Sequence, residues 1–271
     1  MTPYLCSMYG AAMHEISKPG AQRLEHVLAN AAEWALFIDI DGTLLDLAPR
    51  PDATVVPARL VQTLGGLVER LGGAVALVTG RRVSDADRFF EPLRLVTSGV
   101  HGAEARIVRG GTTELLAAPV PRRMLQAVHA IAELGPGILI EEKGAGVAVH
   151  YRDAPLLLPA IERELARIIH EWDSYTVRSG RKVLEVVPKA HSKGTGLSAL
   201  MRLPAFSGRR PIMIGDDRGD EPAMHLAQRM GGLALKVAGE HFDRRVADFD
   251  SAASVRSWLS RLADPARCDP A

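Results

Sequence analysis

The chain has 271 residues, of which 47% are apolar and 24% are charged, and its formal net charge is +1. This balance is typical of a globular protein, and it excludes a chain whose overall charge attracts nucleic acid or an anionic membrane. Because its only two cysteines, Cys6 and Cys268, lie near opposite ends, we expect no disulfide framework and a cytoplasmic protein. Residues 1–20 are expected to form a flexible tail without a signal peptide, and no apolar run is long enough to span a membrane.

Two parts of the chain predict alternating strands and helices. Residues 34–38 form a short apolar run typical of a buried strand, and leucines within 60–71 recur at helical spacing before a Gly-Gly pair. Further strands are expected at 74–78, 93–97, 211–214 and 233–237, with a helix between the last two. This order predicts a doubly wound, Rossmann-like α/β core with a parallel sheet.

The middle of the chain has a different pattern. Helices are expected at 122–134 and around 161–169, and strand pairs at 138–142 with 146–151 and at 175–178 with 182–187, the second pair joined by a turn at 179–181. Glycine-rich and proline-rich stretches near 110–121 resemble a link out of the core. We therefore expect an α+β cap at 113–188, inserted into a core made of 21–112 and 189–271, with hinges near 110–121 and 186–193 that let the cap move as a lid.

Four separate segments carry polar residues suited to a phosphate and a metal ion. Asp39 and Asp41 follow the first strand, Thr79 follows the second, Lys193 precedes an expected helix, and two further aspartates follow the strand at 211–214. Open α/β sheets bind ligands at the carboxyl ends of their strands, and burying two like charges together is costly without a cation or another partner. Taken singly, each residue is explained as a turn, cap or surface residue. Together they indicate a catalytic phosphate site.

In this order the motifs resemble those of the haloacid dehalogenase superfamily of phosphatases; they are the DIDGT run at 39–43, Thr79, Lys193 and the GDD run at 215–217. The resemblance implies that Asp39 is the nucleophile and becomes an aspartyl-phosphate, while Asp41 protonates the leaving oxygen and then activates water. Thr79 and Lys193 would hold phosphoryl oxygens, a role that agrees with the positioning and charge neutralisation on which phosphoryl transfer depends. The resemblance also implies that Asp39, the carbonyl oxygen of Asp41 and Asp216 bind a Mg²⁺ ion, with Asp217 or Asp220 in a supporting role.

The expected cap carries charged residues on its strands. Glu141 and Lys143 lie two residues apart and therefore share a strand face, and Lys182 and Glu185 belong to the second hairpin. Carboxylates and ammonium groups on one face can hold sugar hydroxyls. Cross-strand ion pairs on a solvated sheet face would explain the same residues, and the pattern alone leaves both interpretations open.

With these stretches the resemblance sharpens to the trehalose-6-phosphate phosphatases; they are GVHGAE at 99–104, EEK at 141–143, HYR at 150–152, GRK at 180–182 and GDDRGDE at 215–221. The resemblance implies hydrolysis of trehalose 6-phosphate to trehalose and phosphate, as a step of trehalose biosynthesis, and a functional link to a trehalose-6-phosphate synthase. Within the implied substrate-binding set, Glu141, Lys143 and Glu185 would contact the distal glucose. The whole set is Gly80, Arg81, His101, Glu141, Lys143, Lys182 and Glu185.

Two positions depart from that family's pattern. Gly219 stands where the family usually has Thr, and Val187 stands where a basic residue usually precedes the proline. Neither removes a catalytic group, but the sequence leaves the ester open: sucrose 6-phosphate, glucosylglycerol phosphate and mannosyl-phosphoglycerate remain alternatives. A non-catalytic phosphosugar sensor is a further alternative, although it would be expected to lack a catalytic group. Neither nucleic acid nor membrane is expected as a partner.

Overall fold

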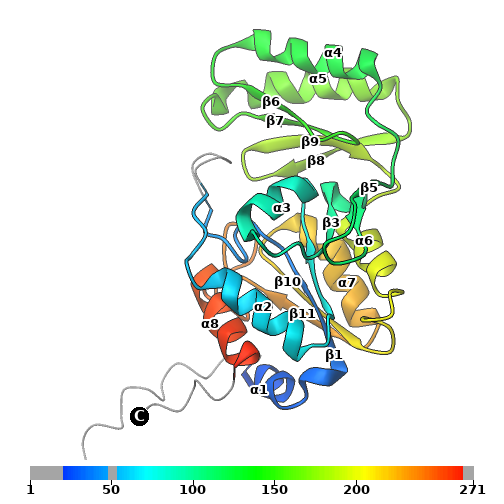
Figure 1. The fold of residues 1–271 in the computed structure, drawn as a ribbon. Helices are drawn as coiled ribbons and strands as arrows, with labels where there is room; N and C mark the ends of the chain where they lie inside the picture. The colour runs from blue at the N-terminus through cyan, green and yellow to red at the C-terminus, as the bar shows by residue number, and fades with distance from the viewer. Residues whose placement is uncertain (1–20, 48–53, 265–271) are drawn as a thin grey trace, which may run out of the picture.

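A computed structural model of the protein describes residues 21–47 and 54–264, which form two sheets with separate sets of helices (Figure 1). The predicted tail at 1–20 and both cysteines lie outside the described residues. The helices are α1 Ala21–Ala29, α2 Leu60–Arg70, α3 Val83–Phe90, α4 Arg122–His129, α5 Leu158–His170, α6 Lys193–Leu200, α7 Glu221–Arg229 and α8 Ala252–Ala263. The strands are β1 Trp34–Ile38, β2 Val75–Val78, β3 Val96–Gly99, β4 Glu104–Arg106, β5 Glu114–Leu115, β6 Leu139–Glu142, β7 Val147–His150, β8 Tyr175–Gly180, β9 Val183–Pro188, β10 Arg210–Gly215 and β11 Leu233–Lys236.

The larger sheet has the strand order β11-β10-β1-β2-β3-β4-β5. Its strands are parallel from β11 to β3, and β4 and β5 add an antiparallel edge. All five residues of β1 are buried, as expected for a central parallel strand covered on both faces. Helix α2 contributes a buried leucine stripe and packs against α8, while α6 packs against α7. The predicted doubly wound α/β fold is confirmed.

The smaller sheet is antiparallel throughout, with the order β6-β7-β9-β8. Helices α4 and α5 cover its outer face, and its other face is turned toward the larger sheet (Figure 1). Its own buried cluster includes Val128 of α4, Ile161 of α5 and Val186 of β9. The predicted small α+β layer is therefore present, and it is called the cap below.

Some predicted boundaries were wrong. The strand expected at 93–97 is β3, Val96–Gly99, because its pairing with β2 begins only at Val96. The helix expected at 122–134 is α-helical to His129 and continues as a 3-10 helix over Ala130–Leu134. The turn between β8 and β9 falls at 181–182, because Gly180 still pairs with Val183.

Two further findings bear on the arrangement of the chain. Strand β5, Glu114–Leu115, pairs with β4 of the larger sheet, although its residues fall in the range expected for the cap. In the part of the chain that the structure describes, no helix has both the length and the apolar character needed to cross a membrane.

Candidate active site

Asp39 comes directly after β1, at the carboxyl end of a fully buried strand of the larger sheet. Its backbone N–H donates to the carbonyl oxygen of Ile214 in the neighbouring strand β10 (3.0 Å), which fixes the main chain at this point. Asp39 is 4% exposed, and its Oδ1 accepts a hydrogen bond from Lys193 Nζ at 2.7 Å. Asp39 is thus a buried carboxylate held by one ammonium group.

Lys193 is the first residue of α6, and the local sequence explains its placement. The Ser192 side chain accepts from the N–H of Thr195, and the Thr195 side chain accepts from the N–H of Ser192, which together form a capping box. Nζ of Lys193 also donates to Asp220 Oδ1 at 2.7 Å, so the ammonium bridges two carboxylates. Burial would lower the pKa of Lys193, but Asp220 and Asp39 together hold this pKa well above its usual value.

Asp39, Asp216 and Asp220 form a cluster in which one oxygen of each lies within 4.8 Å of the others. Burial raises the pKa of Asp39 well above its ordinary value against the pull of Lys193. Burial, followed by the charges of Asp220 and Asp217, raises the pKa of Asp216 to about 8, and burial also raises that of Asp220 to about 6. Three carboxylates facing one ammonium group are short of positive charge, and hard cations prefer oxygen ligands. The cluster is therefore suited to hold a metal ion.

The backbone around the cluster is shaped to bring these carboxylates together. Gly42 has φ +77°, and a Cβ at this position would collide with the carboxylate of Asp216. The hydroxyl of Thr43 donates to Asp216 Oδ1 at 3.4 Å. Asp220 Oδ2 accepts from the backbone N–H groups of Asp216 and Asp217, at 3.1 Å and 3.2 Å. The DIDGT segment and the loop after β10 are thus fitted to each other.

Asp41 is held by an arginine rather than by the carboxylate cluster. Arg81 Nε donates to Asp41 Oδ2 and Nη2 donates to Oδ1, both at 2.6 Å, in a bidentate pair. The guanidinium lies over the ring of Phe89, 4.8 Å from its centroid. Thr79 sits at the end of β2, where its Oγ1 accepts from the N–H of Arg81 at 3.1 Å. Thr79, Arg81 and Asp41 therefore form one connected group beside Asp39.

The cap contributes a second buried charge network. Glu185 of β9 accepts from Lys143 Nζ through Oε1 at 2.6 Å, and its Oε2 lies 2.7 Å from Nε2 of His101 in the core. Lys143 Nζ also donates to the carbonyl oxygen of Gly80 at 3.1 Å, so it links the cap to the loop after β2. Burial would raise the pKa of Glu185, but Lys143 and His101 hold this pKa well below its usual value.

Glu141 lies beside this network and is held by a histidine. Its Oε2 is 2.7 Å from His150 Nε2 and 3.9 Å from Lys143 Nζ. Burial would raise the pKa of Glu141, but the hydrogen bond from His150 and the charge of Lys143 lower it. His150 did not belong to the predicted site. His150 lies two residues from Ala148 and therefore on the same face of β7, and Ala148 pairs with Glu141 in the β6–β7 register. This alternation along the strand is the signal in the sequence that could have identified His150.

The two remaining predicted side chains, those of Lys182 and Asp217, make none of the side-chain hydrogen bonds described above. Lys182 is exposed in the turn between β8 and β9, with φ +58°. Asp217 accepts from the N–H of Gly219 through Oδ1 at 2.7 Å, as the N-cap of the short 3-10 helix Arg218–Asp220. The metal role of Asp217 and the substrate role of Lys182 stay predictions.

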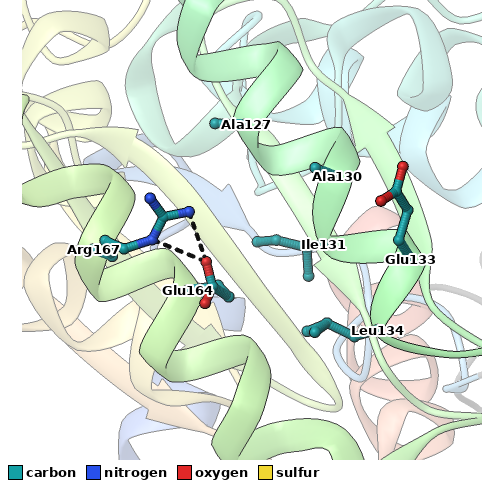
Figure 2. Close-up of a pocket in the computed structure, with 7 residues that line it drawn as sticks. All are labelled: Ala127, Ala130, Ile131, Glu133, Leu134, Glu164 and Arg167. Atoms are coloured by element: carbon teal, nitrogen blue, oxygen red, sulfur yellow. Dashed lines mark hydrogen bonds and ion pairs between the residues drawn. The ribbon is translucent and has the colours of Figure 1, made fainter.

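A pocket elsewhere in the cap is separate from this site. It lies between α4 with its 3-10 extension and α5, where Arg167 and Glu164 form an ion pair at 2.8 Å (Figure 2). None of the predicted site residues lines it.

Comparison with known proteins agrees with this geometry. The family model described as trehalose-phosphatase matches residues 37–254. The chain belongs to the trehalose-phosphatase family. It is 38% identical to a probable trehalose-phosphate phosphatase of Sinorhizobium fredii, over 90% of this chain and 93% of that protein. It is 36% identical to the trehalose-6-phosphate phosphatase of Escherichia coli, over 76% of this chain and 78% of that protein.

The fold is similar to that of a solved member of this trehalose-phosphatase group. The C-terminal domain of Candida albicans trehalose-6-phosphate phosphatase superposes with a TM-score of 0.74, covering 89% of this chain and 96% of that one at 19% sequence identity. At this identity the likeness supports the fold alone, an α/β core with a separate small antiparallel sheet.

Proposed function

We propose that this chain hydrolyses trehalose 6-phosphate to trehalose and inorganic phosphate through a phosphorylated Asp39, with Mg²⁺ as its metal ion. As a member of the trehalose-phosphatase family, the chain is a phosphoric monoester hydrolase, and its closely matched relatives carry the same activity in their names. The observation that carries the proposal is the convergence of three separate segments, which supply Asp39, Lys193 and the pair Asp216 and Asp220, on one buried point. We infer a cytoplasmic location and a supplying synthase from the sequence alone.

The carboxylate cluster fits a magnesium ion. Asp39 and Asp216 offer oxygen ligands, and the raised pKa values indicate that the cluster lacks positive charge. Asp220 contributes in another way, because both of its oxygens already accept hydrogen bonds from Lys193 and the backbone. When bound, Mg²⁺ neutralises phosphoryl oxygens and the carboxylates around them, as in other phosphoryl-transfer sites.

The protein's own groups supply the two steps of the reaction. In the first, an oxygen of Asp39 bonds to phosphorus, the bond from phosphorus to the sugar oxygen breaks, and Asp41 gives its proton to that oxygen. In the second, water attacks phosphorus, Asp41 takes the water proton, and the Asp39–phosphorus bond breaks to release phosphate. Lys193 and the Thr79 hydroxyl hold phosphoryl oxygens throughout.

Arg81 has a defined place in this scheme. Its Nε and Nη2 groups donate to both oxygens of Asp41, whereas the first step needs a proton on one of those oxygens. An incoming phosphate offers the same fork of oxygens as a carboxylate, so it competes with Asp41 for the guanidinium. We infer that substrate binding draws Arg81 toward the phosphate and frees Asp41 for proton transfer.

The cap determines the ester in this proposal. Glu141, Lys143 and Glu185 converge beside the loop that follows β2, where the second glucose of trehalose 6-phosphate would lie when its phosphate reaches Asp39. We take the cap as a lid that begins after β5 and ends near residue 188, with the rest of the described chain as the core.

A phosphate-release assay tests the proposal. The full chain is given trehalose 6-phosphate, sucrose 6-phosphate, glucosylglycerol phosphate, mannosyl-phosphoglycerate and glucose 6-phosphate, each with Mg²⁺ and with a chelator. We expect the highest kcat/KM with trehalose 6-phosphate and loss of that activity on chelation. Equal or faster release from sucrose 6-phosphate, or no release from trehalose 6-phosphate, would overturn the assignment of the substrate.

A further inference from the structure

His101 lies between the loop that follows β2 and the cap. Its backbone N–H donates to the carbonyl oxygen of Thr79 at 3.1 Å, and its ring fills the space in front of Gly80, where an added Cβ would lie 2.7 Å from Nε2. On the cap side, the same Nε2 is 2.7 Å from Glu185 Oε2. One imidazole therefore contacts both the segment expected to hold phosphate and the strand expected to recognise sugar.

The backbone is held in an unfavourable conformation to place this ring. Val100 has φ +46° and His101 has φ +52°, the left-handed region that a β-branched residue such as valine rarely adopts. The surrounding structure enforces it: the Val100 N–H donates to the Arg81 carbonyl oxygen at 2.9 Å, and the Val100 side chain is fully buried with Ala145 of the cap. Such strain persists where surrounding contacts maintain it, and it concentrates at functional sites.

The two donors of Glu185 come from different parts of the molecule. Lys143, which serves Oε1, belongs to the cap, whereas His101, which serves Oε2, belongs to the core. A carboxylate with a fixed donor on each oxygen has a fixed orientation. Glu185 therefore takes up this orientation only while the cap rests on the core.

We propose that His101 is a positioning residue that acts through Glu185 and makes recognition of the second sugar depend on cap closure. The inference rests on the proposed function, which assigns Glu185 to the distal glucose. Sequence resemblance places His101 among the substrate contacts, but the residue is only 7% exposed and its Nε2 is already paired with Glu185. Its Nδ1 is buried and has no hydrogen-bond partner among the described residues. His101 thus serves the sugar by aiming a cap carboxylate.

A double-mutant cycle tests this inference in the full chain with saturating Mg²⁺. His101→Ala, Glu185→Ala and the double variant are assayed on trehalose 6-phosphate and on p-nitrophenyl phosphate, which lacks both sugars. Removing one hydrogen bond to a buried charge should lower kcat/KM for trehalose 6-phosphate by about 10- to 100-fold. We expect a much smaller loss on p-nitrophenyl phosphate, and a double variant no worse than Glu185→Ala alone.

Conservative variants separate positioning from packing. The amide nitrogen of Gln reaches about where Nε2 of His lies, so His101→Gln should recover part of the activity on trehalose 6-phosphate, whereas the shorter His101→Asn should not. The matched control is His129→Ala, which removes another histidine–glutamate pair of the cap. His129 lies 2.7 Å from Glu142, and both side chains are half exposed and away from the core. We expect that control to stay within about twofold of wild type on both substrates.

Each contrary result has a distinct meaning. Additive losses in the double variant would show that His101 serves the substrate independently of Glu185, and equal losses on both substrates would show a structural role; either result overturns the inference. Thermal unfolding identifies a variant that does not fold, and the comparison of Gln with Asn then replaces the alanine variant. A wild-type chain inactive on trehalose 6-phosphate would overturn the proposed function itself, whereas failure among the variants of an active wild type overturns only this inference.

Discussion

The core and the cap each bury a network of carboxylates and ammonium groups, yet the pKa values of their carboxyl groups are shifted in opposite directions. In the core, three aspartates face Lys193, and burial raises the pKa values of Asp39 and Asp216. In the cap, burial acts on Glu185 as well, but Lys143 and His101 outweigh it and lower the pKa. The difference lies in the number of partners, because the core carboxylates share one ammonium group whereas Glu185 has a separate partner for each of its two oxygens.

This contrast shows that the two networks depend on ligands in different ways. The core network lacks positive charge and gains stability when a cation arrives. The cap network is already balanced, so a sugar can bind there only by exchanging hydrogen bonds that the protein now makes to itself. Exchange of this kind favours selectivity over affinity, since an ester without matching hydroxyls leaves buried polar groups unsatisfied. The core should therefore govern the rate, and the cap should govern the choice of substrate.

The largest expected effect follows from changing the core nucleophile. Asp39→Asn keeps the size of the side chain but removes its charge, so we expect kcat to fall by at least about 10⁴-fold on every phosphate ester. Steady-state phosphate release measures this loss, and Asp46→Asn, at an exposed aspartate paired with Arg256, is the control. Retention of full turnover by Asp39→Asn would contradict the proposed mechanism.

A smaller effect, confined to substrate choice, is expected in the cap. Lys143→Met removes the ammonium that Glu185 and Gly80 share, so we expect kcat/KM for trehalose 6-phosphate to fall by about 10- to 100-fold. The ratio of this value to that for p-nitrophenyl phosphate measures selectivity and should fall as well. Lys182→Met serves as the comparison, because Lys182 is exposed in its turn and should matter less. A uniform loss on both esters would break the division of labour between core and cap.

These contrasts also show what the sequence reveals about the fold. The continuous apolar run at 34–38 predicts a buried strand with the bounds that β1 has, because a central parallel strand needs apolar residues on both faces. Strands β4 and β5 were not predicted, since three and two residues give too little pattern to recognise. The 3-10 ending of α4 was also missed, because its apolar spacing continues that of the helix.

At the site, the sequence reveals the residues better than their partners. The rule that the carboxyl ends of parallel strands meet at one edge of the sheet is enough to predict that Asp39 and Asp216 lie together. The pairing of Arg81 with Asp41 spans 40 residues, and that of His101 with Glu185 spans 84. Such contacts depend on how the cap and the loops pack in three dimensions. Local periodicity carries no information on that packing.

Because the core has too little positive charge for its carboxylates, we expect the stability of the metal-free protein to depend on pH. The pKa of Asp216 is about 8 in the folded state and near 3.8 when unfolded, so between these values the folded state binds more protons. The free energy of unfolding should therefore fall as pH rises from about 4 to about 8, with Asp220 contributing up to about 6.

Thermal unfolding in a chelator at pH 5.5, 7.0 and 8.5 measures this trend, at roughly 2–4 °C in Tm for each kcal/mol. Added Mg²⁺ should raise Tm most at pH 8.5, where the carboxylates are ionised. Asp216→Asn should flatten the decline. A constant or rising Tm across this range in the chelator would show that the core is not short of positive charge.

The smallest effect is expected where the cap and core meet in solvent. Arg181, in the turn between β8 and β9, pairs with Glu240 of the core at 3.0 Å, and both side chains are well exposed. Exposed ion pairs contribute little and are screened by salt, so Arg181→Gln should lower kcat/KM for trehalose 6-phosphate by no more than about fivefold, and less at high salt. Arg167→Gln, which breaks an exposed pair within α5, is the control. If Arg181→Gln lowered kcat/KM as much as Lys143→Met does, cap closure would depend on exposed contacts between the cap and the core. The buried contacts of Glu185 would then not be what connects sugar recognition to the core.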